Sequence, residues 1–491
     1  MAWILQHRFR RSTVILLLCL SFLGGVGLAH FVYTTSLVWA GFAGIFLLPS
    51  WARHNLLAVV AVIALGLCVG LWRGAIFMQK LADYDQVLDQ KVTITAQATE
   101  DATYGKTKQL TFAADNIVLE NGERLTGKVQ LSGFGVNAIF DGDVVVATGK
   151  LRQGFSAYQG RMSFAVLEVV EHHPSIVSDI RRKFAAGMRT ALPEPCASFA
   201  MGILVGQRAT LPDEVKEDFL MVGLTHIVAV SGYNLTIILH ASNKLLGKQS
   251  KRMSTFLSLS LIAVFLMLAG ASASIVRAAI VSVLSIAAGY YGRSFRPLTL
   301  LSFAAAITVW ANPFYLWSDL SWYLSFLAFY GVMVLSPLVQ KRWPARWHQT
   351  LVGGVALESI CAEVMSLPFV LHIFGQMSLV GLPSNMLVVT LVPLAMLLGV
   401  IAGLAGMLFG AIAGWLSWPA VILLNYMLDV AHIMAHLPRI FIENRNLSLS
   451  LALGFYGLIV LLTWSLWHKT KDQRPDIITD INQPKVRGLL A

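Results

Sequence analysis

Residues 12–32 read STVILLLCLSFLGGVGLAHFV, an apolar run without lysine, arginine or acid that follows the basic start MAWILQHRFRR. A membrane-spanning helix needs about 20 apolar residues, so this stretch predicts a span. The start resembles a signal peptide, but further apolar runs follow at once, which favours an uncleaved anchor. Arg8, Arg10 and Arg11 are then expected to stay in the cytoplasm under the positive-inside rule.

Apolar runs of similar length recur through the 491 residues, of which 56% are hydrophobic and 13% charged. Basic loops alternate with these runs as the positive-inside rule requires. We therefore predict a mainly α polytopic membrane protein, with both termini cytoplasmic and about twelve spans, some of them broken or re-entrant. The spans are expected near 12–32, 35–50, 55–77, around 225–238, and near 254–271, 273–291, 298–314, 319–339, 350–371, 384–406, 412–435 and 447–467.

Residues 83–172 interrupt this pattern with short alternating runs. The candidate strands are KVTITAQAT at 91–99, QLTFAADNIVL at 109–119, GKVQLSG at 127–133, DVVVATGKL at 143–151 and SFAVLEVV at 163–170. Turn sequences such as NGE at 121 and DGD at 141 separate them. Five strands in about ninety residues suit an inserted all-β, OB-like barrel. Because three spans precede it, the barrel is expected outside the cytoplasm.

The predicted barrel carries aromatic side chains that could stack on nucleotide bases. They are Tyr104, Phe134, Phe155 and Tyr158, all in loop-like positions. Its charge argues differently, because twelve acidic and eight basic residues give residues 83–172 a net charge of −4 in a chain of +11. Strand binding and a structural or docking role both stay open.

Composition divides the chain into five parts. They are an N-terminal three-helix transmembrane region (1–80), the barrel (83–172), an interfacial amphipathic linker (173–193), a second membrane region (194–470) and a cytoplasmic tail (471–491). The four cysteines lack metal-ligand spacing, so the sequence predicts neither a metal centre nor another cofactor.

The second membrane region contains THIVAVSGYNLTII at 225–238, which places His226, Ser231, Gly232 and Asn234 within an apolar run. Three interpretations compete: a helix-packing contact, an intramembrane catalytic serine, and a broken helix beside a polar path. Ser231 and His226 lie about 140° apart on a regular helix, and no GxSxG sequence is present. We therefore expect no catalytic residue here.

Further polar residues lie within predicted spans, where they are functional candidates by default. Arg277 follows Ser274 by one turn in ASASIVRAAIVSVL, and its guanidinium needs an acid, a phosphate or water because it keeps its charge. A buried pair with Glu358 or Glu363 and a role in a polar path both fit. Asn385 marks the start of a later span.

Other polar residues favour structural interpretations. Pro368 is expected to interrupt its helix, and Asp319 to cap a helix at the outer interface. Asp429, His432 and His436 could share one side of a helix near its outer end. A metal site is conceivable there, but interfacial polar residues are favoured because no other ligands accompany them.

Four blocks, taken together and in order, resemble the ComEC-type competence proteins, the inner-membrane channels of natural transformation. The blocks are FLMVGLTHIVAVSGYNLTII (219–238), LAGASASIVRAAIVSVL (268–284), NPFYLWSDLSWYLSFLAFYGVMVLSPL (312–338) and FGQMSLVGLPSNMLVV (374–389). The resemblance implies transport of single-stranded DNA into the cytoplasm. It makes pathway candidates of His226, Ser231, Gly232, Asn234, Ser274, Arg277, Glu363 and Asn385.

The chain departs from the family pattern at Asn234, where members usually carry a second histidine. It ends about 24 residues after its last predicted span, without the metallo-β-lactamase-like domain of larger members, and it has no Walker sequence. The expected partners are therefore the lipid bilayer, a periplasmic DNA receptor, a cytoplasmic motor ATPase, single-strand-binding proteins and a separate nuclease. The alternatives are a transporter of another polar or lipid substrate with the barrel as a partner dock, and an intramembrane serine hydrolase.

Overall fold

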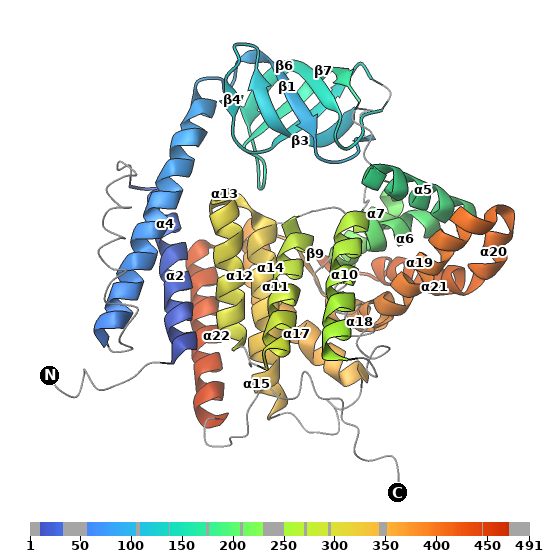
Figure 1. The fold of residues 1–491 in the computed structure, drawn as a ribbon. Coiled ribbons are helices and arrows are strands. Elements are labelled where there is room, and N and C mark those ends of the chain that lie inside the picture. The colour runs from blue at the N-terminus through green and yellow to red at the C-terminus, as the bar shows by residue number, and fades with distance from the viewer. Residues whose placement is uncertain are drawn as a thin grey trace, which may run out of the picture. The chain divides into compact units, whose positions relative to one another are not determined.

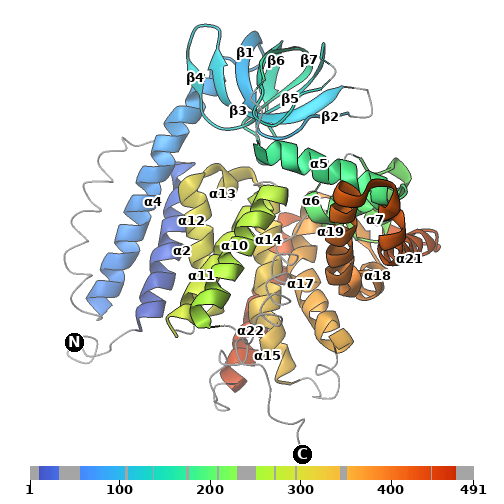
Figure 2. The ribbon, with the colours of Figure 1, turned by 45° about the vertical axis from the view of Figure 1, so that its right-hand side comes forward.

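The computed structural model (Figures 1 and 2) describes residues 10–32, 56–104, 109–136, 138–172, 176–206, 210–228, 250–269, 273–292, 296–342, 351–443 and 445–470. The chain divides into two units. Unit 1 comprises Met1–Ala186 and Ser302–Tyr323, and unit 2 comprises Gly187–Leu301 and Leu324–Ala491.

Among the described residues, seven helices are long and apolar enough to cross a membrane. They are Arg11–Ala29, Ala58–Asp85, Leu320–Gln340, Ala356–Ile373, Gly381–Phe409, Trp418–Ala435 and Leu449–His468. Three shorter apolar helices, Cys196–Val205, Ser274–Tyr290 and Pro297–Ala311, accompany them. The chain is thus a multi-pass membrane protein with an inserted β-rich region. The span expected at 35–50 and the part of the span around 225–238 that follows Val228 lie outside the described residues, and the total of twelve stays a prediction.

In unit 1, helices α2 (Arg11–Ala29) and α4 (Leu56–Asp85) pack along each other through glycines. A Cβ atom at Gly25 would overlap the carbonyl oxygen of Leu67, and one at Gly70 would overlap that of Phe22. Helices in lipid gain little from burying apolar surface, so close backbone approach at small residues provides their packing energy.

Helices α12 (Pro297–Ala311) and α13 (Phe314–Ser318) end beside this pair. Arg73 of α4 donates from Nε to the carbonyl of Trp310 at 2.9 Å and from Nη2 to that of Ala311 at 3.1 Å. These bonds satisfy carbonyls that the end of α12 leaves open. Asp319 Oδ1 accepts a bond from the Ser321 amide at 2.9 Å, which confirms the predicted cap.

The inserted region of unit 1, called the β-domain below, is a sheet whose pairings close on themselves (Figure 1). Its strands are β1 (Lys91–Ala98), β2 (Thr103–Tyr104), β3 (Leu110–Leu119), β4 (Arg124–Leu125), β5 (Val129–Phe134), β6 (Val144–Gln153) and β7 (Gly160–Glu171). The ring runs β1–β3–β5–β7–β6–β1, with β5 and β7 parallel and the other neighbours antiparallel. All five predicted strands are confirmed as strands.

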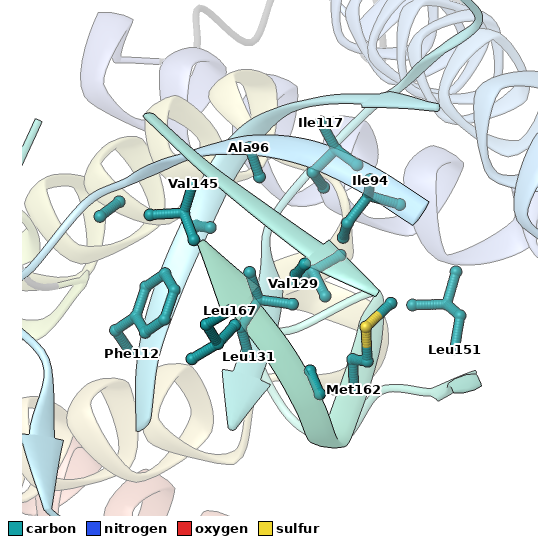
Figure 3. Close-up of a cluster of buried hydrophobic side chains, with 14 of the residues drawn as sticks. Ile94, Ala96, Phe112, Ile117, Val129, Leu131, Val145, Leu151, Met162 and Leu167 are labelled. Carbon is teal, nitrogen blue, oxygen red and sulfur yellow. The ribbon is translucent and has the colours of Figure 1, made fainter. Parts of the chain in front are cut away.

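The core of the β-domain consists of the side chains on the inner face of each long strand (Figure 3). Ile94, Phe112, Leu131, Met162 and Leu167 each expose 2% of their surface or less. They come from four different strands, two of them from β7, so the alternating pattern of each strand supplies one wall of a shared interior. This burial requires the long-range pairings and not only the local alternation.

Helix α5 (Ile176–Ala191) follows the β-domain, and its first part belongs to unit 1. Arg182 places its guanidinium over the Phe140 ring, 4.3 Å from the centroid. Arg181 lies 3.8 Å from the carboxylate of Asp141. The basic start of the helix is thereby attached to the loop that precedes β6.

In unit 2, the helices form two groups (Figure 2). One group contains α17 (Leu351–Ile373), η1 (Gly331–Leu335), α15 (Ser336–Gln340) and α22 (Leu449–Thr470), with α14 (Leu320–Tyr330) leading into it. The other contains α6 (Cys196–Val205), α7 (Asp213–Met221), α8 (Thr225–Val228), α18 (Gly381–Val388), η2 (Val389–Leu391), α19 (Val392–Phe409), η3 (Gly410–Ile412), α20 (Ala413–Leu416) and α21 (Trp418–Ala435). Helix α10 (Lys251–Ala269) packs on α11 (Ala273–Tyr290), and β8 (Met377–Ser378) pairs with β9 (Phe441–Ile442).

The expectation that Pro368 interrupts its helix was wrong, because α17 continues through this residue to Ile373. Proline removes one amide donor, yet helices in membranes tolerate it where other groups bind the freed backbone. Just upstream, the Ser366 hydroxyl lies 3.0 Å from the Ala362 carbonyl and 3.3 Å from that of Glu363. The helix therefore carries Glu363 and Pro368 within one continuous element.

The close packing of α2 on α4 predicts different effects for two adjacent glycines. Gly25→Ala should destabilise the protein by about 1–3 kcal/mol, because its methyl group would displace the Leu67 backbone. Gly24→Ala is the matched control, since its Cβ would make only an ordinary 3.7 Å contact with the Leu67 side chain. Thermal unfolding in detergent measures both; equal midpoints for the two variants would contradict the packing.

Candidate functional site

Three of the predicted pathway residues, Ser231, Gly232 and Asn234, lie outside the described residues. The helix break expected at Ser231–Gly232 therefore stays a prediction. The segment leading to it is described through Val228, the last residue of α8. The candidate site comprises this segment and the elements of unit 2 that pack against it.

The segment begins with a tight turn between α7 and α8 that depends on Gly223. Its φ of +74° belongs to the left-handed region that glycine adopts without strain. The Gly223 amide donates to Leu220 at 3.2 Å, and the Leu224 amide donates to Phe219 at 2.8 Å. These bonds close α7 in the manner of a glycine C-cap.

His226 is held by the same turn. Its Nδ1 lies 3.1 Å from the Gly223 carbonyl oxygen. Because a carbonyl oxygen only accepts hydrogen bonds, Nδ1 is the protonated nitrogen and the donor. The Nε2 atom is then left as an acceptor, and the side chain is exposed. His226 thus presents an acceptor nitrogen at the start of the segment that leads to Ser231.

The element packed against the turn is the β8–α18 connection. A Cβ at Gly223 would lie 3.3 Å from the Ser378 Cβ, so the two backbones approach closely. The hydroxyl of Ser384, fully buried, lies 2.8 Å from the Val222 carbonyl and 2.9 Å from that of Gly381. The Ser384 hydroxyl therefore links the first turn of α18 to the end of α7 through a hydrogen bond that two carbonyls share.

Glu363 reaches the same place from α17. A Cβ at Gly381 would lie 3.4 Å from Oε1 of Glu363, which puts the carboxylate beside the first residue of α18. A helix N-terminus presents amide dipoles that favour a negative charge. This half-buried acid therefore lies where a negative charge is favoured, and it links α17 to the first residue of α18.

Two buried polar atoms, one on β8 and one on α18, lack hydrogen-bond partners among the described residues. They are the Oδ1 of Asn385 and the Oγ of Ser378. A buried polar atom without a partner costs about 1–3 kcal/mol, so such atoms point to water, a ligand or a further protein group. We call Gly223, Glu363, Ser378, Ser384 and Asn385 the turn cluster.

The structure thus brings the elements of His226, Glu363 and Asn385 together, as a polar path would require. Ser274 and Arg277 belong to α11, which packs mainly on α10. Arg277 is almost fully enclosed, with 1% of its surface exposed. Ser378 and Ser384 were missed from the sequence, where nothing distinguishes them from other serines near a helix start.

The aromatic residues predicted for base stacking differ in accessibility. Tyr104, Phe134 and Phe155 are exposed on the β-domain, with Phe155 at 67%. Tyr158 is half-buried, and burial, followed by the negative charges of Glu100 and Asp319, raises its pKa to about 12. The sequence did not single out Phe164, which exposes 71% of its surface on β7.

Acidic groups gather near Tyr158. Burial raises the pKa of Glu100, although its carboxylate accepts a 3.0 Å bond from the Ala113 amide and lies near Lys128. Burial also raises the pKa of Asp115. Carboxylates of Glu100 and Asp319 thus lie near Tyr158, in keeping with the net negative charge of residues 83–172.

Comparison with known proteins assigns this multi-pass membrane chain to a family. It matches the Competence protein family over residues 203–469, more than half of its length. The chain belongs to this family, which confirms the resemblance seen in the four sequence blocks. The match includes α8, α11, α17 and α18, the elements that carry every described pathway candidate.

One relative is the ComE operon protein 3 of Bacillus subtilis (strain 168). The two are 26% identical over 246 residues, which cover 49% of this chain and 31% of the relative. The chain thus matches about a third of that protein's length. No solved structure matches the chain.

The geometry of the turn predicts that Gly223→Ala is more damaging than a similar change elsewhere. Both Gly223 and Gly292 have positive φ, so alanine at either costs about 1 kcal/mol or more in backbone strain. Only at Gly223 would the methyl also press on Ser378, because Gly292 faces open space. We expect a lower unfolding midpoint for Gly223→Ala than for Gly292→Ala; the reverse order would contradict the packing.

The buried acid of the β-domain predicts a pH dependence. Burial raises the pKa of Glu100 in the folded β-domain above its ordinary value of 4.5, so folding favours the protonated carboxyl. The stability that this proton contributes is fully present below pH 4.5 and is lost as the pH rises through the raised pKa. Glu100→Gln keeps an acceptor for the Ala113 amide and removes the buried charge. It should therefore stabilise the β-domain at pH 7 and have little effect below pH 4.5.

Pulse proteolysis of the full chain measures the stability of the β-domain at each pH. Glu120→Gln, on an exposed turn, is the control and should differ little from the parent at any pH. A Glu100→Gln variant that is less stable than the parent at pH 7 would contradict the assignment.

Proposed function

We propose that the chain forms an inner-membrane channel that carries single-stranded DNA into the cytoplasm during natural transformation. Membership in the Competence protein family over residues 203–469 carries this proposal. The matched region contains the turn cluster, where buried polar atoms without partners lie between apolar helices. A polyanion crossing lipid needs hydroxyls, amides and few fixed charges, each binding weakly enough for the strand to advance.

The proposed path uses two kinds of contact. A broken helix at Ser231–Gly232 would offer backbone amides, as discontinuous helices do in transporters. Arg277 would offer a charge-assisted contact to phosphate. His226, Asn234, Ser274, Glu363 and Asn385 would line the path as neutral or proton-bearing polar groups.

We further propose twelve spans, cytoplasmic termini and an extracytoplasmic OB-like β-domain, with domain limits as given from the sequence. The closed strand order and the parallel β5–β7 pair support the OB-like assignment. The negative charge of the β-domain favours a docking or structural role over strand binding. Tyr104, Phe134 and Phe155 stay candidates for stacking, with Tyr158 less accessible.

The proposed partners would deliver the DNA, draw it inward and process the second strand. DNA would be delivered by a periplasmic receptor and drawn inward by a motor ATPase or by single-strand-binding proteins. A separate nuclease would remove the second strand. A transporter of another substrate would instead leave transformation intact when the gene is deleted and change the envelope composition.

Replacement of Arg277 tests the path. Arg277→Glu and Arg277→Gln should reduce transformation toward that of a deletion strain, because the enclosed site would lose its phosphate contact. Arg277→Lys keeps the charge and should retain part of the activity. Immunoblots of the membrane fraction control for protein level; normal DNA uptake by Arg277→Gln at parental level would contradict the role.

Replacement of the serine separates the channel from the hydrolase. Ser231→Ala should retain most DNA uptake in a channel, and a serine-directed covalent probe should leave residue 231 unlabelled. Labelling of Ser231 together with loss of activity in the alanine variant would favour the hydrolase.

A further inference from the structure

A second polar group lies in unit 2 where α7 meets the end of α21. His432 Nδ1 lies 2.8 Å from Oδ2 of Asp218, and 214 residues of sequence separate the two. His436 follows His432 by one turn, and the centroids of the two imidazole rings are 4.3 Å apart. The three side chains therefore converge from two helices onto one location.

The geometry of this group suits a cation. Asp218, His432 and His436 each offer one ligand atom, and these atoms all lie within 4.8 Å of one another. A zinc ion with ligand bonds of about 2.0–2.2 Å holds its ligands roughly 3.4 Å apart, so a small rotation closes the set. His432 is 61% exposed and can move, whereas Asp218, at 14%, is fixed against the protein.

The residue types also agree with a transition metal. Histidines four residues apart share one side of a helix, and a carboxylate completes a set of two imidazoles and one oxygen. No other group of three or more such side chains within this reach occurs among the described residues. His172 and Asp143 form a similar pair at 3.0 Å, but no third ligand joins it.

We propose that Asp218, His432 and His436 form a binding site for a divalent transition-metal ion of the zinc type. Two neutral imidazoles would give nitrogen lone pairs and the carboxylate one oxygen, which leaves a fourth position for water. Asp429, one turn before His432, lies outside the group of ligand atoms. The sequence alone favoured interfacial polar residues because Asp218 is so distant along the chain.

The bound ion would cross-link α7 to α21. Helix α7 leads directly into the Gly223 turn, so the ion would fix the element that positions the turn cluster. A structural ion adds its binding free energy to the stability of the folded state. This inference is independent of the proposed transport of DNA, and its test needs no transformation.

Metal binding by the purified full chain tests the proposal. The protein, without a polyhistidine tag, is stripped with chelator in detergent and titrated with Co²⁺, whose visible absorption reports its coordination. We expect one Co²⁺ per chain, displaced by Zn²⁺, and a rise in the unfolding midpoint on metal addition. Absence of stoichiometric binding by the folded parent would overturn the proposal.

Three variants locate the site. His436→Ala and Asp218→Asn should each weaken binding by at least about tenfold, whereas His172→Ala, from the two-member pair, should bind like the parent. The metal-free unfolding midpoint of His436→Ala should match the parent, because the side chain is exposed. Unchanged affinity in a folded His436→Ala protein would also overturn the proposal.

Discussion

The hydroxyl of Ser384 and the Val222 carbonyl form the contact on which the rest of unit 2 depends. Their 2.8 Å hydrogen bond joins the first turn of α18 to the end of α7 inside an apolar protein. In such surroundings every polar group needs a partner, so this bond limits how the two elements can separate. Gly223, with its left-handed backbone conformation, and the carboxylate of Glu363 both lie close to Gly381, which accepts a bond from the same hydroxyl.

Local sequence features predicted the elements well. Runs of about 20 apolar residues gave helices at ten of the twelve expected spans, and alternation gave the five long strands of the β-domain. Apolar periodicity needs only neighbouring residues, which is why these predictions succeed. Pro368 was misjudged because a membrane helix can continue through proline when nearby groups bind its backbone.

The sites were less predictable because they depend on pairings across long distances. His226, Glu363 and Asn385 were singled out as intramembrane polar residues, yet nothing in the sequence indicated that their elements meet. Ser378 matters only because it faces Gly223, and Asp218 only because α7 packs on α21. Ser231, Gly232 and Asn234 lie outside the described residues, and their roles stay predictions.

The β-domain and the membrane region differ in charge and in their buried polar groups. The β-domain buries a closed core, and residues 83–172 carry a net negative charge. The described part of the membrane region encloses few charged groups, and two of its buried polar atoms without hydrogen-bond partners, Ser378 Oγ and Asn385 Oδ1, lie on the elements beside the turn that leads to the predicted helix break. Few positive side chains within the described spans, Arg277 among them, are compatible with the proposed passage of a polyanion, because tighter binding would hold the strand in place.

The most direct measurement of this claim is a photo-crosslink from the turn cluster to incoming DNA. A photoreactive side chain at Ser378, in cells taking up labelled DNA that is too long to clear the membrane, should crosslink to the single strand. The same probe at Leu453, an exposed position on α22, provides the background. Crosslinking at Ser378 above that background is the predicted result; equal labelling at both positions, with uptake intact, would contradict a path through the turn cluster.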